Sequence, residues 1–265
     1  MDKVNELTKS QKEDEDLLIA KLNDKIKFVK ARNRFQSTDF LDPMQRSILN
    51  DVVSKNKELD YEFFGGYENA ERTMLILKPD NFKEIANSKI YNQIMRIIRI
   101  VLPKEEWGKY EHKSYLGALM KLGLKREKVG DIIVRSDGAD IIISKDIEEF
   151  LLQSLNGLIR FQKAEITSED ISDLKYVLPE KKIFKINVPS MRLDAIVGEL
   201  ARCSRNDASR LLEEERVFID FKVEIRGTKQ VKEGTQITIR GKGRFKITQI
   251  LGTTRKGRYT LEVEK

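Results

Sequence analysis

Arginine residues recur through the stretch 192–216, where the apolar residues lie at helical spacing. The spacing predicts one helix over 191–201 and a second that begins after Ser204, a favoured capping residue. At the start of that second helix, free backbone N–H groups and the helix dipole attract phosphate. Arg205 and Arg210 are placed to grip neighbouring phosphates with forked guanidinium groups. The pattern therefore predicts a polyanion-binding surface, and the alternative is an ordinary helical hairpin with solvated arginines.

A second basic feature lies further along the chain, where glycines separate Arg240, Lys242 and Arg244. Glycine lets a backbone approach phosphate closely, and the three cations add charge. The run is not a nucleotide-binding P-loop, because no Gly-Lys-Ser/Thr follows four residues after a glycine. We expect a basic turn between two strands that contacts RNA.

The distribution of charge along the 265 residues also favours a polyanion-binding surface in the last third of the chain. The whole chain has 50 Lys and Arg against 43 Asp and Glu, which gives a net charge of +7. Residues 183–265 alone hold 18 basic and 11 acidic residues, so the entire excess lies in the last third. Such asymmetry is typical of a polyanion-binding module joined to neutral partners, although a charged surface also serves solubility.

The composition limits the other kinds of site. Cys203 and His112 are the single cysteine and histidine, so we expect neither an intrachain disulfide nor a Cys/His zinc site, and no cofactor. No run of eighteen apolar residues predicts a transmembrane helix, and no membrane insertion is expected. The N-terminal residues do not have the pattern of a secretory signal, which favours a cytoplasmic protein.

The order of predicted elements indicates an α+β protein of three structured parts and one linker. These are an N-terminal helical region at 1–62, a central α/β domain at 63–168, a polar linker at 169–182 and a C-terminal domain at 183–265. Asp42-Pro43 is expected to begin a helix, because Asp caps well and Pro suits the first helical turn. After the two helices of the C-terminal domain, short β-prone runs separated by glycines predict a small sheet.

The central domain is predicted to be a sandwich of helices packed on one sheet. An Asp-Gly pair at 137–138 stands between two β-branched runs and indicates a hairpin. We expect strands at 73–78, 131–135, 139–144 and 163–167, and helices at 91–102, 113–122 and 147–158. The first three strands contain no aromatic residue, so they lack the base-stacking pattern of an RNA-recognition motif.

The C-terminal stretch resembles the αL-type RNA-binding domain first recognised in small-subunit ribosomal protein S-four. The matching pieces occur in the family's order and are Arg192-Leu-Asp194, Ser204-Arg205, Arg216-Val-Phe-Ile-Asp220-Phe-Lys222 and Lys232-Glu-Gly-Thr-Gln-Ile-Thr-Ile239. Two positions depart from the family pattern. Glu215 stands where the family often has Gly, and Asp220-Phe221 replaces Asn-Gly. The added carboxylates are expected to weaken phosphate binding near this turn.

Motifs in the rest of the chain resemble those of the YlmH family. They include Phe40-Leu-Asp-Pro43, Phe64-Gly-Gly-Tyr67, Ala70-Glu-Arg72, Leu116-Gly-Ala-Leu119 and Gly130-Asp-Ile132. The resemblance implies a central domain with the fold of an RNA-recognition motif, followed by the S-four-type domain. It also implies binding to ribosomal RNA or tRNA on the large ribosomal subunit, a role in quality control of stalled chains, and a link to bacterial cell division.

The residues expected to contact RNA lie at the helix starts, in the turns and at the motif positions of the C-terminal domain. They are Arg192, Asp194, Ser204, Arg205, Asn206, Ser209, Arg210, Arg216, Lys222, Arg240, Lys242 and Arg244.

Two other functions are compatible with such a domain. S-four-type domains also occur in RNA-modifying enzymes, but we find no Gly-rich loop after a first strand, as a Rossmann-type methyltransferase needs. Arg192-Leu-Asp194 is already explained by the small domain, so it does not indicate a pseudouridine synthase. We therefore expect a binding protein and not an enzyme. The remaining alternative is an adaptor whose residues 1–60 dock a protein partner while the C-terminal domain holds RNA.

Overall fold

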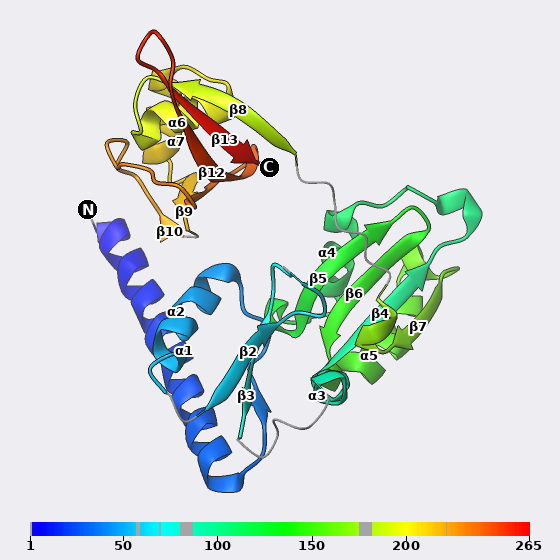
Figure 1. Cartoon of the computed structure of the whole chain (residues 1–265). Helices are drawn as coiled ribbons and strands as arrows, with labels where there is room; N and C mark the ends of the chain where they lie inside the picture. Colours follow the sequence, from blue (N-terminus) through cyan, green and yellow to red (C-terminus); the bar gives the residue numbers. More distant parts are fainter. Residues whose placement is uncertain (1, 57–58, 69, 80–86, 175–181, 221) are drawn as a thin grey trace. The chain divides into compact units, whose positions relative to one another are not determined.

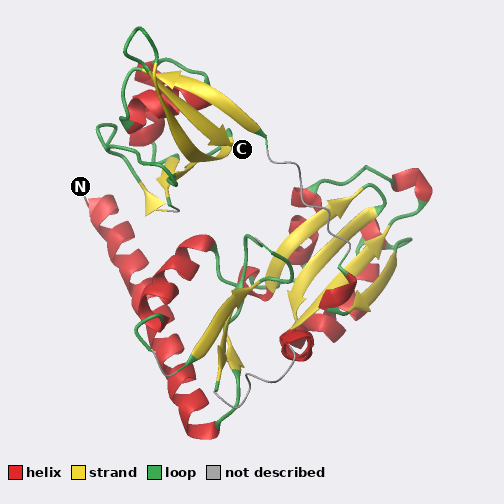
Figure 2. Ribbon diagram, in the orientation of Figure 1, coloured by secondary structure: helices red, strands yellow, loops and turns green. Residues whose placement is uncertain are grey.

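The computed structural model describes residues 2–56, 59–68, 70–79, 87–174, 182–220 and 222–265. The chain divides into two compact units, Met1–Val177 and Leu178–Lys265. The N-terminal unit contains two antiparallel sheets with their helices, and the C-terminal unit contains a third (Figures 1 and 2). This mixture of helices and sheets confirms the predicted α+β class.

The first sheet has three strands and packs against two helices. Its elements are α1 (Asp2–Arg32), β1 (Gln36–Ser37), α2 (Pro43–Val53), β2 (Asp60–Phe64) and β3 (Met74–Lys78), with the strand order β1-β3-β2. Asp42 begins α2 as predicted: its side chain accepts a hydrogen bond from the Gln45 N–H, and the Gln45 side chain accepts one from the Asp42 N–H. The region predicted to be helical thus also contains β1 and part of β2. The strand predicted at 73–78 is confirmed, but it pairs here and not in the central sheet.

The second, central sheet has the βαββαβ topology of an RNA-recognition motif. Its elements are α3 (Asn87–Ile94), β4 (Met95–Val101), α4 (His112–Lys121), β5 (Val129–Arg135), β6 (Gly138–Ser144), α5 (Glu148–Ser154) and β7 (Glu165–Glu169), with the strand order β5-β6-β4-β7. Short 3-10 turns lie at Lys104–Glu106, Arg126–Lys128, Lys145–Ile147, Leu155–Gly157, Ile159–Phe161 and Ile171–Asp173. The hairpin predicted around Asp137-Gly138 is confirmed as β5–β6.

The helix predicted over 91–102 is wrong for most of its length. The helix α3 ends at Ile94, and the chain continues as β4, the strand at the centre of the sheet. Ile97, Ile98 and Val101 have helical spacing, but a strand with both faces covered also reads as a continuous apolar run. Periodicity alone does not distinguish these two cases, and here the pairing with β6 and β7 decides.

Both faces of the central sheet are buried over much of its length. On one face, Ile98 and its neighbours pack against α4 and α5. On the other face, Ile97 and Ile142 pack against Phe40 and Met74 from the first sheet and its connections. This second face lies opposite the helices, where an RNA-recognition motif stacks bases. Apolar packing therefore occupies the place that stacked bases would take, and the lack of strand aromatics has a structural reason.

The motifs that resemble the YlmH family meet at the junction of the two sheets. Asp131 accepts hydrogen bonds from the Tyr67 hydroxyl at 2.7 Å and from the Arg72 N–H at 3.1 Å. The Arg72 guanidinium donates to the carbonyl oxygens of Val129 and Phe40 at 3.0 and 2.9 Å. These partly buried bonds satisfy backbone groups that a packed junction would otherwise leave without partners. The motif residues thus fix one sheet against the other.

The C-terminal unit packs two helices against a six-stranded antiparallel sheet. Its elements are β8 (Ile183–Val188), α6 (Leu193–Ala201), α7 (Arg205–Glu213), β9 (Val217–Ile219), β10 (Lys222–Val223), β11 (Gln236–Ile239), β12 (Gly243–Thr253) and β13 (Tyr259–Glu264), with the strand order β10-β9-β11-β12-β13-β8. Its core includes Ile196 and Val197 of α6 and Leu212 of α7. The sequence analysis did not predict β8, although Ile186 and Val188 alternate with exposed polar residues as an edge strand requires.

Two glycines of the central domain give opposite expectations for substitution by alanine. A Cβ atom at Gly138 would lie 1.9 Å from the Ile100 carbonyl oxygen, whereas Gly117 in α4 has open space around it. We expect Gly138→Ala to lower the free energy of unfolding by about 2 kcal/mol or more. Gly117→Ala should raise it by about 1 kcal/mol, since alanine is the better helix former. Urea unfolding followed by Trp107 fluorescence measures both; a neutral Gly138→Ala would contradict the packing of this hairpin.

Candidate functional site

A buried carboxylate joins the starts of the two helices in the C-terminal unit. Asp194, in the first turn of α6, has a side chain that is only 5% exposed. Arg192, the residue that caps α6, binds it through two hydrogen bonds, Nε–Oδ1 at 3.1 Å and Nη2–Oδ2 at 2.7 Å. Arg205, the first residue of α7, binds the same Oδ2 through Nη2 at 3.0 Å. One carboxylate thus holds two guanidinium groups side by side.

The two arginines keep part of their hydrogen-bonding capacity. The side chain of Arg205 is 63% exposed and that of Arg192 is 34% exposed. Each uses Nε and Nη2 toward Asp194, which leaves N–H groups that can donate elsewhere. The triad of one carboxylate and two guanidinium groups carries a net charge of +1. Its geometry suits an oxyanion that lies against both arginines.

The arginines stabilise the charged form of the carboxylate. Hydrogen bonds from Arg192 and then Arg205 lower the pKa of Asp194 to about 2, although burial acts in the opposite direction. The same interaction with Asp194 raises the pKa of Arg192. Asp194 was predicted to contact RNA, and the structure places it beneath the arginines as the group that positions them.

The start of α7 has the cap that the sequence predicts. The Ser204 Oγ accepts a hydrogen bond from the Asp207 N–H at 3.1 Å and donates one to the Asp207 carboxylate at 2.6 Å. These bonds with Ser204 lower the pKa of Asp207. The cap uses the Ser204 hydroxyl within the protein, so Ser204 fixes where Arg205 begins the helix.

The outer face of α7 presents further polar residues. Ala208 and Leu212 are buried, while Asn206 and Arg210 are exposed and Ser209 is partly exposed. Asn206 and Arg210 are four residues apart, so their side chains lie on the same side of the helix. The structure therefore brings Arg205, Asn206 and Arg210 together on the solvent side of one short helix.

The β11–β12 turn forms a second group of basic residues. The Arg216 guanidinium donates to the Arg240 carbonyl at 3.2 Å, and the Arg240 guanidinium lies 4.9 Å from the Phe218 ring centre. Lys242 is exposed at the tip. The positive charge of Lys242 acts to lower the pKa of the Cys203 thiol in the α6–α7 loop. Burial nevertheless raises the pKa of Cys203, so its thiol has no activated character.

The two departures from the S-four pattern fall on backbone positions with positive φ. Glu215 has a φ of 54° and Asp220 a φ of 46°. This left-handed conformation explains why glycine or asparagine suits these positions. Asp220 is used structurally: its carboxylate accepts from the Gln236 N–H at 3.0 Å across the β9–β11 pair. Glu215 is exposed beside Arg216, where its charge opposes an approaching phosphate.

Two predicted residues have less defined roles. Arg244 is exposed and lies opposite Thr238 in the β11–β12 pair. Lys222 begins β10, and its side chain lies outside the described part of the structure.

Sequence reasoning missed three cations at the far end of the β12–β13 hairpin. Arg255, Lys256 and Arg258 lie in or next to the exposed turn that follows Thr253. The signal was available, because a basic run with Gly257 stands between two β-prone segments. These residues extend the positive charge of the C-terminal unit beyond the two groups that were predicted.

Two surveys of the described residues give negative findings. Across the ranges of the chain that the structure describes, no three His, Cys, Asp or Glu side chains gather as a metal site would require. In the same ranges, no helix has the length and apolar character needed to cross a membrane.

Comparison with known proteins gives matches over both units. A family model described as "Putative RNA-binding domain in YlmH" matches residues 79–173. The chain is 32% identical over 242 residues to the "Ribosome-associated protein quality control protein P2" of Bacillus subtilis, and the match covers 90% of each protein. The solved structure of "Cell division protein ylmH from Streptococcus pneumoniae" is 22% identical, with 60% of this chain and 93% of that chain covered and a TM-score of 0.48.

Replacement of Asp194 by asparagine should loosen the helix pair at neutral pH. The folded pKa lies below the ordinary value of 3.8, so the stabilisation is present above pH 4 and is lost as the pH falls toward 2. We expect Asp194→Asn to cost about 2 kcal/mol at pH 7, since one pKa unit corresponds to about 1.4 kcal/mol. Hydrogen exchange of the α6 amides measures this loss. Equal exchange in both proteins at pH 7 would show that the stability of the helix pair does not depend on the Asp194 carboxylate.

Replacement of Glu215 by glycine should stabilise the protein and strengthen its binding to a polyanion. Relief of the left-handed strain should raise the free energy of unfolding by about 1 kcal/mol. Loss of the carboxylate beside Arg216 should also tighten binding of a polyanion. Urea unfolding and a heparin-column salt elution measure the two effects separately. Glu215→Ala serves as the control, because it removes the charge and keeps the strain.

Proposed function

Since the chain belongs to the YlmH family, we propose that it is a non-catalytic RNA-binding protein whose C-terminal unit holds structured RNA on the ribosome. The observation that carries this proposal is the pair of guanidinium groups that share the buried Asp194 carboxylate. An arginine fork fixed by a partner binds phosphate with less loss of side-chain freedom than a mobile one.

The other basic residues extend this contact to several phosphates. Arg210 on α7 and Lys242 on the β11–β12 turn are exposed cations of the same unit. Exposed cations suit the backbone of a folded RNA, since contacts to phosphate position a protein and carry little sequence information. We therefore expect recognition of RNA shape through this unit.

The family relationship supports a role for this chain on the ribosome. The relative from Bacillus subtilis is named as a ribosome-associated quality control protein. We propose that this chain likewise binds ribosomal RNA or tRNA on the large ribosomal subunit, in the cytoplasm, and acts on stalled translation. The family's link to cell division stays a prediction for this protein.

The rival functions make different demands on the C-terminal surface. An RNA-modifying enzyme would turn over a methyl donor or isomerise uridine, and detection of either product would contradict the binding function. An adaptor that docks through residues 1–60 would keep its ribosome association when Arg205 and Arg210 are replaced. Co-sedimentation with ribosomal subunits at graded salt separates these cases, since phosphate contacts weaken steeply as salt rises.

Replacement of Arg205 and Arg210 by alanine should reduce RNA affinity about tenfold or more without unfolding the protein. Two lost phosphate contacts should also make the dependence of log K on log salt shallower by about 2. Filter binding to purified ribosomal RNA at several salt concentrations measures both quantities.

Two controls accompany this double variant. Arg205→Lys with Arg210→Lys keeps the charge but loses the fork, so it should retain the salt slope and lose part of the affinity. Lys113→Ala with Lys121→Ala removes the same charge from the exposed side of α4. If this pair weakens RNA binding as much as the arginine pair, the effect reflects net charge and the proposed surface is wrong.

A further inference from the structure

The second half of α1 carries a concentration of positive charge that the neutral total of the first 182 residues conceals. Between residues 21 and 32 there are five Lys and Arg and one Asp, and Arg34 follows just after the helix. The acidic residues of this helix gather earlier, as the run Glu13-Asp-Glu-Asp16. A long polyanion would be attracted to the second half of the helix and repelled by the part before it.

Part of this charge forms a stripe along one side of the helix. Lys21, Lys25, Phe28 and Arg32 follow one another at intervals of four, three and four residues, so they lie within one narrow face. The stripe spans about 17 Å at 1.5 Å per residue. It runs beside the buried face of α1, which packs on the first sheet through residues such as Leu22.

The side chains of the stripe are available for binding. The Phe28 ring is 42% exposed and can therefore contact a partner. Within the ranges that the structure describes, no ion pair or hydrogen bond holds the end of Lys21, Lys25 or Arg32. By contrast, Lys27 on another side of the helix lies 3.6 Å from Asp24. The stripe thus offers three cations and one aromatic ring to a partner.

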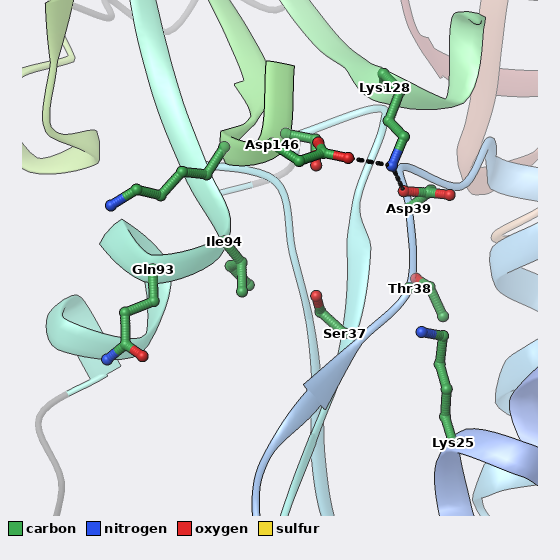
Figure 3. A pocket seen from close by; sticks show the side chains of 10 residues that line it. Lys25, Ser37, Thr38, Asp39, Gln93, Ile94, Lys128 and Asp146 are labelled. Carbon is green, nitrogen blue, oxygen red and sulfur yellow. Dashed lines mark hydrogen bonds and ion pairs between the residues drawn. The ribbon is translucent and has the colours of Figure 1, made fainter. Parts of the chain in front are cut away.

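A polar cavity of about 260 Å³ adjoins the stripe at Lys25. Figure 3 shows the Lys25 side chain extending from α1 toward Thr38, with Ser37 close by. Lys128 lies on the same wall, where its ammonium is bound by Asp39 and Asp146 at 2.7 Å each. Hydroxyl, amide and carboxylate groups of this kind can bind a ribose or the edge of a base.

We propose that this stripe, Lys21, Lys25, Phe28 and Arg32, is a second RNA-binding surface that takes an unpaired segment of RNA. The three cations bind successive stretches of the phosphate backbone, and the Phe28 ring stacks on one base. Cations that alternate with an exposed aromatic ring are the arrangement that binds single-stranded nucleic acid. The cavity beside Lys25 receives the sugar or the base edge of a neighbouring nucleotide.

An acidic protein segment is the other polyanion that could meet this charge. RNA is favoured because stacking on Phe28 needs a flat ring in the partner, and every nucleotide supplies one. The stripe also provides the N-terminal unit with an RNA contact that does not use the covered face of the central sheet. The proposal stands independently of the C-terminal surface, because no residue is shared between the two.

The test compares two triple variants of the full-length chain. Lys21→Gln, Lys25→Gln and Arg32→Gln remove three charges from the stripe. Lys27→Gln, Lys30→Gln and Arg34→Gln remove three charges from other sides of the same stretch, and serve as the matched control. Each is made in the otherwise unchanged chain and with Arg205→Ala and Arg210→Ala, and circular dichroism confirms folding. The probe is a fluorescein-labelled single-stranded RNA of mixed sequence, followed by anisotropy at several salt concentrations.

The stripe variant should bind this RNA at least tenfold more weakly in both backgrounds. Its salt slope should be shallower by about 2, since each single-strand phosphate contributes about 0.7. The control variant should change affinity less than threefold. Phe28→Ala should weaken binding several-fold with an unchanged slope, and Phe28→Trp should restore it.

Three results would overturn the proposal. Equal losses in the stripe and control variants would show an effect of net charge alone, and no loss in either would show that α1 does not bind RNA. Retained RNA affinity with lost ribosome co-sedimentation would identify an acidic protein as the partner. Loss in the stripe variant together with no effect of Arg205→Ala and Arg210→Ala would support this surface and contradict the C-terminal one.

Discussion

The shared hydrogen bonding of Arg192 and Arg205 to Asp194 is the interaction on which the C-terminal unit depends. It joins the first residues of α6 and α7, which are eleven or more positions apart in sequence. A carboxylate that is 5% exposed would be costly without partners, and two guanidinium groups satisfy it. The same bonds hold both arginines at the surface. Stability of the helix pair and geometry of the candidate RNA surface are therefore set by one group.

In the N-terminal unit, one face of the central sheet is covered by the first sheet. The central sheet has the topology of an RNA-recognition motif, yet the first sheet covers the face that would stack bases. Asp131 and Arg72 fix that cover through partly buried hydrogen bonds. RNA contact by this unit would therefore need a surface other than the covered face of the sheet. The proposed basic stripe lies on α1, the helix that packs against the first sheet.

The distribution of charge along the chain bears on both of the proposed surfaces. Over the first 182 residues, the charges of the acidic and basic side chains sum to zero. Salt screens the field of each exposed charge beyond about 10 Å. A partner therefore responds to the charges near its binding surface and not to the net charge of the whole unit. The run Lys21–Arg34 is therefore strongly positive to an RNA segment although the first 182 residues together have no net charge. Net charge per domain indicated the proposed C-terminal surface and gave no sign of the proposed stripe on α1.

The sequence by itself determined the features that depend on interactions between residues close together in the chain. The cap at Ser204, the capping box at Asp42 and the hairpin at Asp137-Gly138 follow from bonds within a few residues, and motif order was enough to indicate the family. Only the tertiary structure decided the rest. It made 95–101 a strand, because pairing with β6 and β7 and burial of both faces remove the alternation that would reveal it. It also turned Asp194 from an expected RNA contact into the support of two arginines, since the burial of a carboxylate depends on residues brought together from distant parts of the chain.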